Sequence, residues 1–196
     1  MKYFEALKAR RSYYNISRES SLTNDELQQL LTDALKYTPS AFNSHSARVV
    51  LLLNENHDKF WNIVMETLRK QVPENKFSST EAKINSFAAG HGTVLFYEDQ
   101  SVVKALQDKF SLYSENFSIW SNNSAGMLQY VVWTGLAQSG IGASLQHYNP
   151  IIDEEVKNTF NIPDSWKLVA QMPFGKPTEE LEAKNDSVED HIIVFK

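Results

Sequence analysis

The most apolar stretch of the chain runs from Ala125 to Ser139, and only three of its residues are clearly polar. A helix without a polar face is typical of a buried position, so this pattern predicts a buried helix around which the rest of the chain packs. About sixteen residues form a rod of roughly 24 Å, which is the width of a small domain and too short for a comfortable membrane span. Gly140 and Gly142 end the predicted helix and leave a turn whose amide groups can face a ligand.

The rest of the sequence alternates between helical and strand-like patterns. Thr23 and Glu26 form a capping box, and the leucines that follow at helical spacing predict a helix that ends at Pro39. Other helices are expected over residues 2–9, 56–72, 76–89, 101–110 and 153–160. Short continuous apolar runs predict strands over residues 49–53, 93–97, 167–172 and 192–195. Between the last two strands, residues 173–177 are expected to form a turn and residues 178–190 a charged loop.

The order of these elements predicts a single domain over residues 1–196. Strands lie among helices, and several connections are long enough to cross over a sheet, which favours an α+β or α/β domain with a central mixed β-sheet flanked by helices. The length is that of one ordinary domain, and the sequence contains no internal repeat or low-complexity linker. The apolar run at 192–195 is expected to pair with a sheet, either of its own chain or of a partner.

Composition and charge narrow the function. The 196 residues include no cysteine, which excludes disulfides, thiol nucleophiles and thiolate-bound iron–sulfur or zinc centres. Redox chemistry would therefore depend on a bound cofactor. The net charge of -5 disfavours a general nucleic-acid binder, because affinity for a phosphate backbone needs clustered cations. The first residues lack the long apolar core of a signal peptide, so a cytoplasmic location is expected.

Besides the turn after the long helix, two segments are candidates for ligand binding. Arg10, Arg11 and Ser12 suit an anion, because guanidinium groups bind phosphate through paired hydrogen bonds and a serine hydroxyl adds a donor. The alternative is that cations at the end of the first helix only complement its dipole. The loop over residues 39–43 precedes a predicted buried strand, where ligand loops are common, but a helix stop followed by an Asx-type turn also explains it.

Other chemistry finds less support. Residues 140–144 do not form a dinucleotide fingerprint, because a helix precedes them and the third glycine is missing. No pair among the five histidines has the spacing of metal ligands, so no metal site is predicted. His147 has the most apolar neighbours in the sequence, and we interpret it as a hydrogen-bonded core histidine rather than a catalytic acid. The sequence contains neither a nucleophile elbow nor a P-loop, which leaves hydrolase functions without supporting residues.

Taken together, three motifs resemble the nitroreductase family of FMN-dependent oxidoreductases. They are Arg10-Arg11-Ser12 after the first helix, Pro39-Ser40-Ala41-Phe42-Asn43 before the first strand, and the small-residue turn after the long helix. The resemblance extends over nearly the whole chain. It is closer to a subgroup found in fungi and some bacteria, through RRSYYNIS, PSAFNSHSARVVLL, GTVLFYED and GIGASLQHYNP, of which the last is the most specific.

This resemblance implies a nitroreductase-like fold and an intertwined homodimer, with two FMN sites at the subunit interface and the long central helix in that interface. One group of residues would hold the FMN phosphate and consists of Arg10, Arg11, Ser12 and Lys184. A second would reach the flavin of the other subunit and consists of Pro39, Ser40 and Asn43. A third would lie along the isoalloxazine, with a backbone amide near its N5, and consists of Ala143, Ser144 and Leu145. The aromatic residues between 110 and 120 would roof the substrate pocket.

The chain departs from the family pattern in two places. Many members have a basic residue a few positions after the arginine–serine motif, whereas residues 13–15 are uncharged here. Lys83 or Asn85 is therefore a candidate to favour the anionic reduced flavin near N1. The usual pair of C-terminal cations is reduced to Lys184, so binding of the phosphate would rest more on the first motif.

The function that the resemblance implies is FMN-dependent oxidation of NAD(P)H, coupled to reduction of nitroaromatics, quinones or similar planar acceptors. Hydride transfer to and from one flavin in one pocket implies ping-pong kinetics. The implied partners are NAD(P)H, a small planar acceptor and a second copy of the chain, with no nucleic acid and no membrane. Two alternatives stay open: a flavin-binding sink or sensor without significant turnover, and a structural dimeric domain whose arginines serve only as helix-end charges.

Overall fold

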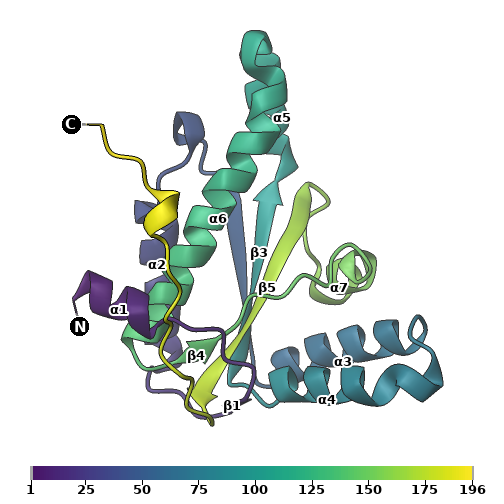
Figure 1. Ribbon diagram of the computed structural model, residues 1–196. Helices are drawn as coiled ribbons and strands as arrows, with labels where there is room; N and C mark the ends of the chain where they lie inside the picture. The colour runs from purple at the N-terminus through teal and green to yellow at the C-terminus, as the bar shows by residue number, and fades with distance from the viewer. Residues whose placement is uncertain (1, 196) are drawn as a thin grey trace.

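The computed structural model describes residues 2–195 and folds them into a central sheet with helices on both faces (Figure 1). The strands are β1 (Ile16–Ser17), β2 (Ala47–Leu53), β3 (Gly92–Asp99), β4 (Gly142–Ala143) and β5 (Trp166–Pro177). The α-helices are α1 (Tyr3–Ala9), α2 (Asn24–Tyr37), α3 (Glu55–Arg69), α4 (Phe77–Ala88), α5 (Gln100–Lys109), α6 (Ser114–Gln138) and α7 (Asp153–Phe160). This arrangement confirms the predicted α+β class.

The sheet has the strand order β1-β5-β3-β2, and β4 also pairs with β5. All of its strand pairs within the described residues are antiparallel, so that Val94 of β3 lies opposite Leu51 of β2 and Met172 of β5. Within residues 2–195 a parallel contact occurs only at the isolated bridge between Ser12 and Ala143, which limits the mixed character predicted for the sheet to that bridge. Every residue of β3 is buried, which explains why the sequence reads there as a short continuous apolar run.

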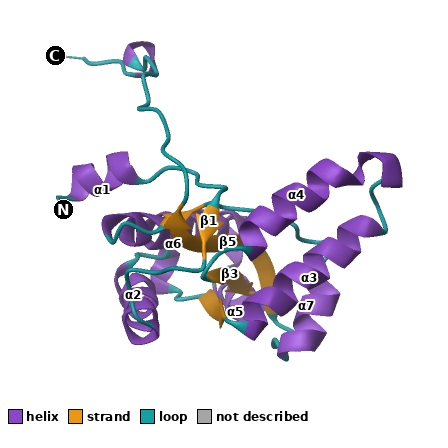
Figure 2. Ribbon diagram, turned by 90° about the horizontal axis from the view of Figure 1, so that it is seen from below, coloured by secondary structure: helices purple, strands orange, loops and turns teal. Residues whose placement is uncertain are grey.

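Helices α2 and α6 cover one face of the sheet (Figure 2). Their inner positions, which include Leu31 and Val132, pack with Val94, Phe96 and Phe174 in one apolar cluster. The structure corrects two predictions for α6. The helix begins at Ser114 rather than near residue 125, and it is not buried all round: Met127 and Val131 on its outer face are each 42% exposed. No helix within residues 2–195 combines the length and the apolar character that crossing a membrane requires.

Helices α3, α4 and α7 pack on the other face, around a core rich in aromatic side chains (Figure 2). This core contains a buried histidine, His57, whereas His147 is exposed, so the prediction of His147 as the core histidine is wrong. The ring of His57 contacts the Thr93 hydroxyl at 2.9 Å through Nδ1 and the Ala88 carbonyl at 3.1 Å through Nε2. Because a carbonyl only accepts, Nε2 carries the proton and Nδ1 accepts from Thr93. The Trp61 indole donates to the same hydroxyl at 2.9 Å.

The C-terminal part of the chain differs from prediction in two ways. The expected turn at 173–177 belongs to β5. The Pro173 carbonyl accepts from the Ser144 amide, just past the end of β4, and the Pro173 nitrogen faces the same side. Because the two-residue strand β4 has already ended there, the missing amide proton of proline does not interrupt a strand pairing. The predicted strand at 192–195 is wrong within this chain. Thr178 and Glu179 still bond to Asn15, directly before β1. The chain then leaves the sheet (Figure 1), and Phe195 is 94% exposed.

Candidate functional site

The segment after α1 and the turn after α6 are joined by main-chain contacts. Arg10 is the C-terminal cap of α1, and the two residues after Arg11 run beside Ala143. The Ala143 carbonyl accepts from the Tyr13 amide at 3.0 Å and from the Trp133 indole of α6 at 3.2 Å. The structure therefore brings the segment Arg10–Ser12 of the first predicted group beside Ala143 of the third, at one end of α6.

Small residues allow this close approach. Gly140 adopts a φ of 75°, a conformation that side chains disfavour, and it turns the chain out of α6 as the sequence predicts. A Cβ on Gly142 would lie 2.8 Å from the Pro177 side chain and 3.0 Å from the Tyr13 side chain. The site therefore depends on glycine at 142 for packing and at 140 for backbone conformation.

The turn continues into a segment held against β5. The Ser144 amide donates to the Pro173 carbonyl at 3.3 Å, and the Ser144 hydroxyl accepts from Gln146 Nε2 at 3.0 Å. Gln146 in turn exchanges two main-chain bonds with Gln171, of 2.7 and 2.9 Å. The amide of Leu145, between these anchors, donates to no acceptor in the described part of the chain. This turn thus offers a fixed backbone donor to a ligand.

Arg10 supplies the strongest electrostatic feature of this region. Its guanidinium carbon lies 4.5 Å from the centre of the Trp133 ring, which holds the cation by a cation–π contact and limits its freedom. Its Nε is buried and has no hydrogen-bond partner among the described residues. Buried donors are normally paired, so this nitrogen fits an absent anionic ligand such as a phosphate.

The other two predicted phosphate residues differ in their surroundings. Arg11 donates through Nη1 to the Glu182 carbonyl of the segment that follows β5, which brings that segment beside the first motif. Lys184, two residues farther on, is 63% exposed, and its Nζ lies 3.7 Å from Asp186. The contact at Glu182 thus places the C-terminal segment beside Arg11, and the exposed pair of Lys184 with Asp186 is a weak one.

The loop over residues 39–43 lies at a different place along α6. The Ala41 amide lies 3.4 Å from the Ser124 hydroxyl of α6, whereas Trp133, nine positions along the helix, contacts Ala143. Nine residues of helix span about 14 Å. The predicted site residues of one chain therefore form two separate groups, with Pro39, Ser40 and Asn43 in the second.

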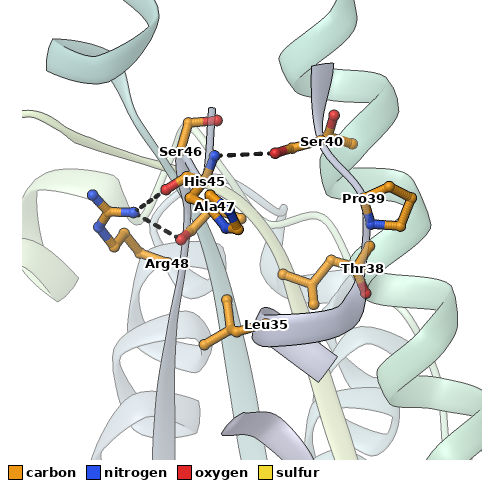
Figure 3. A pocket seen from close by; sticks show the side chains of 10 residues that line it. Leu35, Thr38, Pro39, Ser40, His45, Ser46, Ala47 and Arg48 are labelled. Atoms are coloured by element: carbon orange, nitrogen blue, oxygen red, sulfur yellow. Dashed lines mark hydrogen bonds between the residues drawn. The ribbon is translucent and has the colours of Figure 1, made fainter. Parts of the chain in front are cut away.

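A cavity of about 270 Å³ lies beside this loop (Figure 3). Its lining residues are Leu35, Thr38, Pro39, Ser40, His45, Ser46, Ala47, Arg48, Ser124 and Leu128. The Ser40 hydroxyl accepts from the His45 amide at 3.0 Å, which closes the loop on itself. The Arg48 side chain bonds to the His45 and Ala47 carbonyls and to Asp99, so it serves to hold the start of β2 rather than a ligand.

Phe42 belongs to the second motif, but the sequence analysis assigned it no role of its own. Its φ of 56° is a left-handed conformation that is unusual for a bulky residue, and it turns the ring toward the start of α6. The ring stacks on Trp120, with 5.7 Å between the ring centres, and its centre lies 5.0 and 5.1 Å from those of Phe110 and Phe117. Phe42 nevertheless remains 50% exposed. The aromatic composition of residues 110–120 was the available signal, but nothing in the sequence identified Phe42 as their partner.

Lys83, a candidate for the flavin N1 position, belongs to the opposite layer. Its Nζ lies 5.7 Å from the centre of the Tyr14 ring and 5.8 Å from that of Phe87. Tyr14 lies two residues after the first motif, so the contact with the Tyr14 ring is what links Lys83 to that motif. Asn85 is exposed on α4.

Comparisons with known proteins give a consistent result. The model of the nitroreductase family matches residues 7–176. The putative nitroreductase HBN1 of Saccharomyces cerevisiae is 32% identical over 190 residues, covering 94% of each chain. Nitroreductase CinD from Lactococcus lactis, solved in complex with nicotinic acid, is 38% identical over the full length of both chains, with a TM-score of 0.91. A nitroreductase with bound FMN from Desulfitobacterium hafniense shares the fold at 14% identity, with a TM-score of 0.72.

Proposed function

Because this chain belongs to the nitroreductase family and is an oxidoreductase of that kind, we propose that it binds FMN and uses NAD(P)H to reduce nitroaromatics, quinones or similar planar acceptors. CinD, which covers the whole chain, has also been solved with chloramphenicol and with 4-nitrophenol, and both of these are nitroaromatic compounds. Their likeness to the proposed acceptors supports that class of substrate. Without cysteine the chain has no thiol of its own for electron transfer.

The observation that carries this proposal is the unpartnered, buried Nε of Arg10 beside the Ala143 turn. In the proposed site Arg10, Arg11 and Ser12 bind the FMN phosphate, and Lys184 adds a second cation from the C-terminal segment. Arg10 is fixed over Trp133, so little side-chain entropy would be lost when it binds. When bound, FMN supplies the hydride-transfer chemistry, and the protein supplies binding and orientation.

The turn after α6 is proposed to hold the ring system. Ala143, Ser144 and Leu145 would lie along the isoalloxazine, with the free Leu145 amide as the donor near N5. The anchoring of Ser144 and Gln146 to β5 supports this role, because a rigid donor needs no reorganisation during the reaction. No side chain of the protein needs to act as a nucleophile.

The second group of residues requires a homodimer in this proposal. Pro39, Ser40 and Asn43 would reach the flavin of the partner subunit, and Phe42 with its aromatic neighbours would roof the acceptor pocket. Support comes from exposed apolar surface on α6, where Met127 and Val131 are each 42% exposed, and from the C-terminal segment, where Ile193 is 80% exposed. Large exposed apolar surfaces of this kind are typical of subunit interfaces.

A spectroscopic titration tests the reaction. We expect the purified protein to show a flavin absorption spectrum that bleaches on anaerobic addition of NADH or NADPH and recovers when a quinone or nitroaromatic is added. A flavin that stays oxidised with both nucleotides would identify a sink or sensor instead. A colourless protein that FMN neither reconstitutes nor stabilises would refute flavin binding. Initial rates with both substrates varied should give parallel double-reciprocal lines, whereas intersecting lines would exclude the ping-pong scheme.

Sedimentation tests the dimer. Replacing Met127 and Val131 with glutamate should convert a dimer into a monomer and release FMN, because the partner's loop would be lost from the site. Lys59→Glu on α3 places a new charge on an exposed position of the opposite layer and should change neither property. A double variant that stays dimeric would show that the outer face of α6 is not the interface.

A further inference from the structure

A buried polar atom without a hydrogen-bond partner within the described residues lies near the end of β3, away from Arg10 and Ala143. It is Glu98 Oε1, and the carboxyl group that carries it lines a cavity on the α6 side of the sheet. Polar atoms buried in proteins are nearly always paired with protein groups or water. An unpaired carboxylate oxygen beside a cavity therefore indicates a place where a further molecule belongs.

Glu98 is almost completely enclosed. Its side chain is on the α6 side of β3, and the residue is only 1% exposed. One carboxylate oxygen, Oε2, accepts from the Ser46 hydroxyl at 2.6 Å, and the other has no partner within the described residues. Burial raises the pKa of Glu98, although the Ser46 hydrogen bond and the charge of Arg48 oppose that rise. The carboxyl group thus has one acceptor position available.

A cavity of about 220 Å³ adjoins this carboxyl group, between the first half of α6 and the ends of β3 and β5. Its lining residues are Glu98, Gln100, Ser118, Ser121, Asn122, Asn149, Lys167, Leu168 and Val169. Seven of these nine side chains are polar, which is unusual so close to the core. Ser118 and Asn122 are exposed and mark the opening, so the cavity is accessible from solvent.

The charges around the cavity determine what it can hold. Arg48 is engaged by Asp99 at 3.0 Å, and the side chains contributed by α5 and α6 are neutral. Lys167 lies directly opposite Glu98 in the β3–β5 register and lines the same cavity, yet no ion pair joins the two within the described residues. The cavity therefore presents an unpaired carboxyl group deep inside and a separate ammonium group on its wall.

We propose that this cavity is a second ligand site, separate from the flavin site, and that it binds a small amino acid or a closely similar zwitterion. The ammonium group of the ligand would donate to Glu98 Oε1, with the Ser121 hydroxyl and the amide side chains as further partners. The carboxylate of the ligand would meet Lys167. A diamine would place its second cation against Lys167, and a plain carboxylate would face Glu98, so both fit less well.

L-serine and two analogues test this assignment on the protein with its flavin content measured. Glycerate replaces the ammonium group of serine with a hydroxyl group, and ethanolamine lacks the carboxylate. We expect serine at ten times its dissociation constant to raise the melting temperature by about 3–6 °C. Glycerate should bind at least tenfold more weakly than serine, and ethanolamine should lie between them. Equal effects of all three compounds, or no effect of any, would overturn the proposal, the latter because the cavity would then hold only water.

Glu98→Gln is the matched variant, because it keeps the shape and the acceptor for Ser46 but replaces Oε1 with an amide nitrogen. We expect it to bind serine about 10–100-fold more weakly. Lys167→Met should reduce the affinity for serine to that for ethanolamine. Circular dichroism and flavin content should match the unaltered protein, since the cavity is separate from Arg10 and Ala143. Undiminished serine binding in Glu98→Gln would refute the site.

The pH dependence of binding gives an independent readout. An ammonium ligand favours the ionised form of Glu98, so binding releases a proton and the affinity should rise with pH until Glu98 is ionised without ligand. This dependence should disappear in Glu98→Gln. A profile that remains unchanged in that variant would assign the titration to another group and overturn the role of Glu98.

Discussion

Two clusters of polar groups, one on each face of the sheet, differ in whether they are complete. On the α3 side, Trp61, Thr93, His57 and the Ala88 carbonyl satisfy one another in a closed chain of hydrogen bonds. On the α6 side, Arg10 is held by Trp133 but keeps a buried nitrogen without a partner. The closed cluster has no capacity for a ligand, and the open one does. We therefore expect mutations in the first to change stability alone and mutations in the second to change ligand binding alone.

Replacing both Arg10 and Arg11 with alanine should have the largest effect. Each charge-assisted bond to a phosphate contributes about 1.5–3 kcal/mol, so the affinity for FMN should fall by a factor of about 10²–10⁴. Titration of the flavin-free protein with FMN, followed by fluorescence, measures this loss. Lys8→Ala removes a cation from the last turn of the same helix and is the control. If Lys8→Ala releases FMN equally, the arginines act only as helix-end charges.

Thr93→Val should produce the largest change in stability. It removes the shared hydroxyl and leaves the Trp61 indole and His57 Nδ1 buried without partners, at a cost of about 2–4 kcal/mol in the free energy of unfolding. Urea denaturation measures this cost. The affinity of the folded protein for FMN should not change. Thr93→Ser, which keeps the hydroxyl, should recover most of the stability, and a serine variant as unstable as the valine one would show that packing rather than hydrogen bonding dominates.

Phe42→Ala tests whether the two groups of residues along α6 have separate functions. Its ring packs on Trp120 and Phe117, and the proposal assigns it to the acceptor pocket rather than to FMN itself, so FMN binding should be nearly unchanged. Loss of an aromatic stacking partner should raise KM for a nitroaromatic acceptor about 3–10-fold, with a smaller effect on the rate of flavin reduction by NAD(P)H. Tyr37→Ala, which removes another exposed aromatic side chain, is the control. Equal changes in KM for both variants would contradict a specific role for Phe42.

The smallest expected effect is a pH dependence of the free energy of unfolding, caused by His57 in the closed cluster. Burial lowers the pKa of His57 below its ordinary value, which is about 6.5 in an unfolded chain. Below that pH the unfolded chain binds a proton at His57 more readily than the folded protein does. The contribution to stability is therefore present above about pH 6.5 and is lost as the pH falls through the lower folded pKa. Urea denaturation at pH 7.5 and 5.5 should show this loss, and His57→Gln should reduce it, whereas His45→Gln, at an exposed position, should not.

Most of the fold could be predicted because its signals are local. Helix α7 occupies the residues that its pattern predicts, and β3 extends beyond the predicted run only at its ends. The errors arise where contacts between distant parts of the chain determine the local structure. Pro173 can continue β5 because the neighbouring strand β4 ends at Ala143, and the sequence around Pro173 does not contain that information. The apolar run at 192–195 has the composition of a strand but finds no sheet edge within its own chain.

For the candidate site, the structure shows one of the expected contacts, and the roles of the residues stay predictions. The contact between the segment Arg10–Ser12 and Ala143 agrees with a grouping that only the family resemblance had implied. The sequence could not distinguish His57 from His147, because apolar neighbours along the chain do not determine which side of a strand or helix a residue faces. It could not identify the contacts of Phe42 or Glu98 either, since the residues that they contact are more than fifty positions away in the chain.

Helix α6 also constrains how the length of this chain can vary. Ser124 supports the loop at 39–43 and Trp133 supports the turn at Ala143, with one continuous helix between them. One inserted residue would rotate everything beyond it by about 100° and advance it by about 1.5 Å. Seven inserted residues would restore the phase to within about 20° but separate the two supports by a further 10 Å or so. A substitution between Ser124 and Trp133 therefore changes one side chain and leaves this spacing intact, whereas insertions and deletions there would destroy the alignment of the two supports.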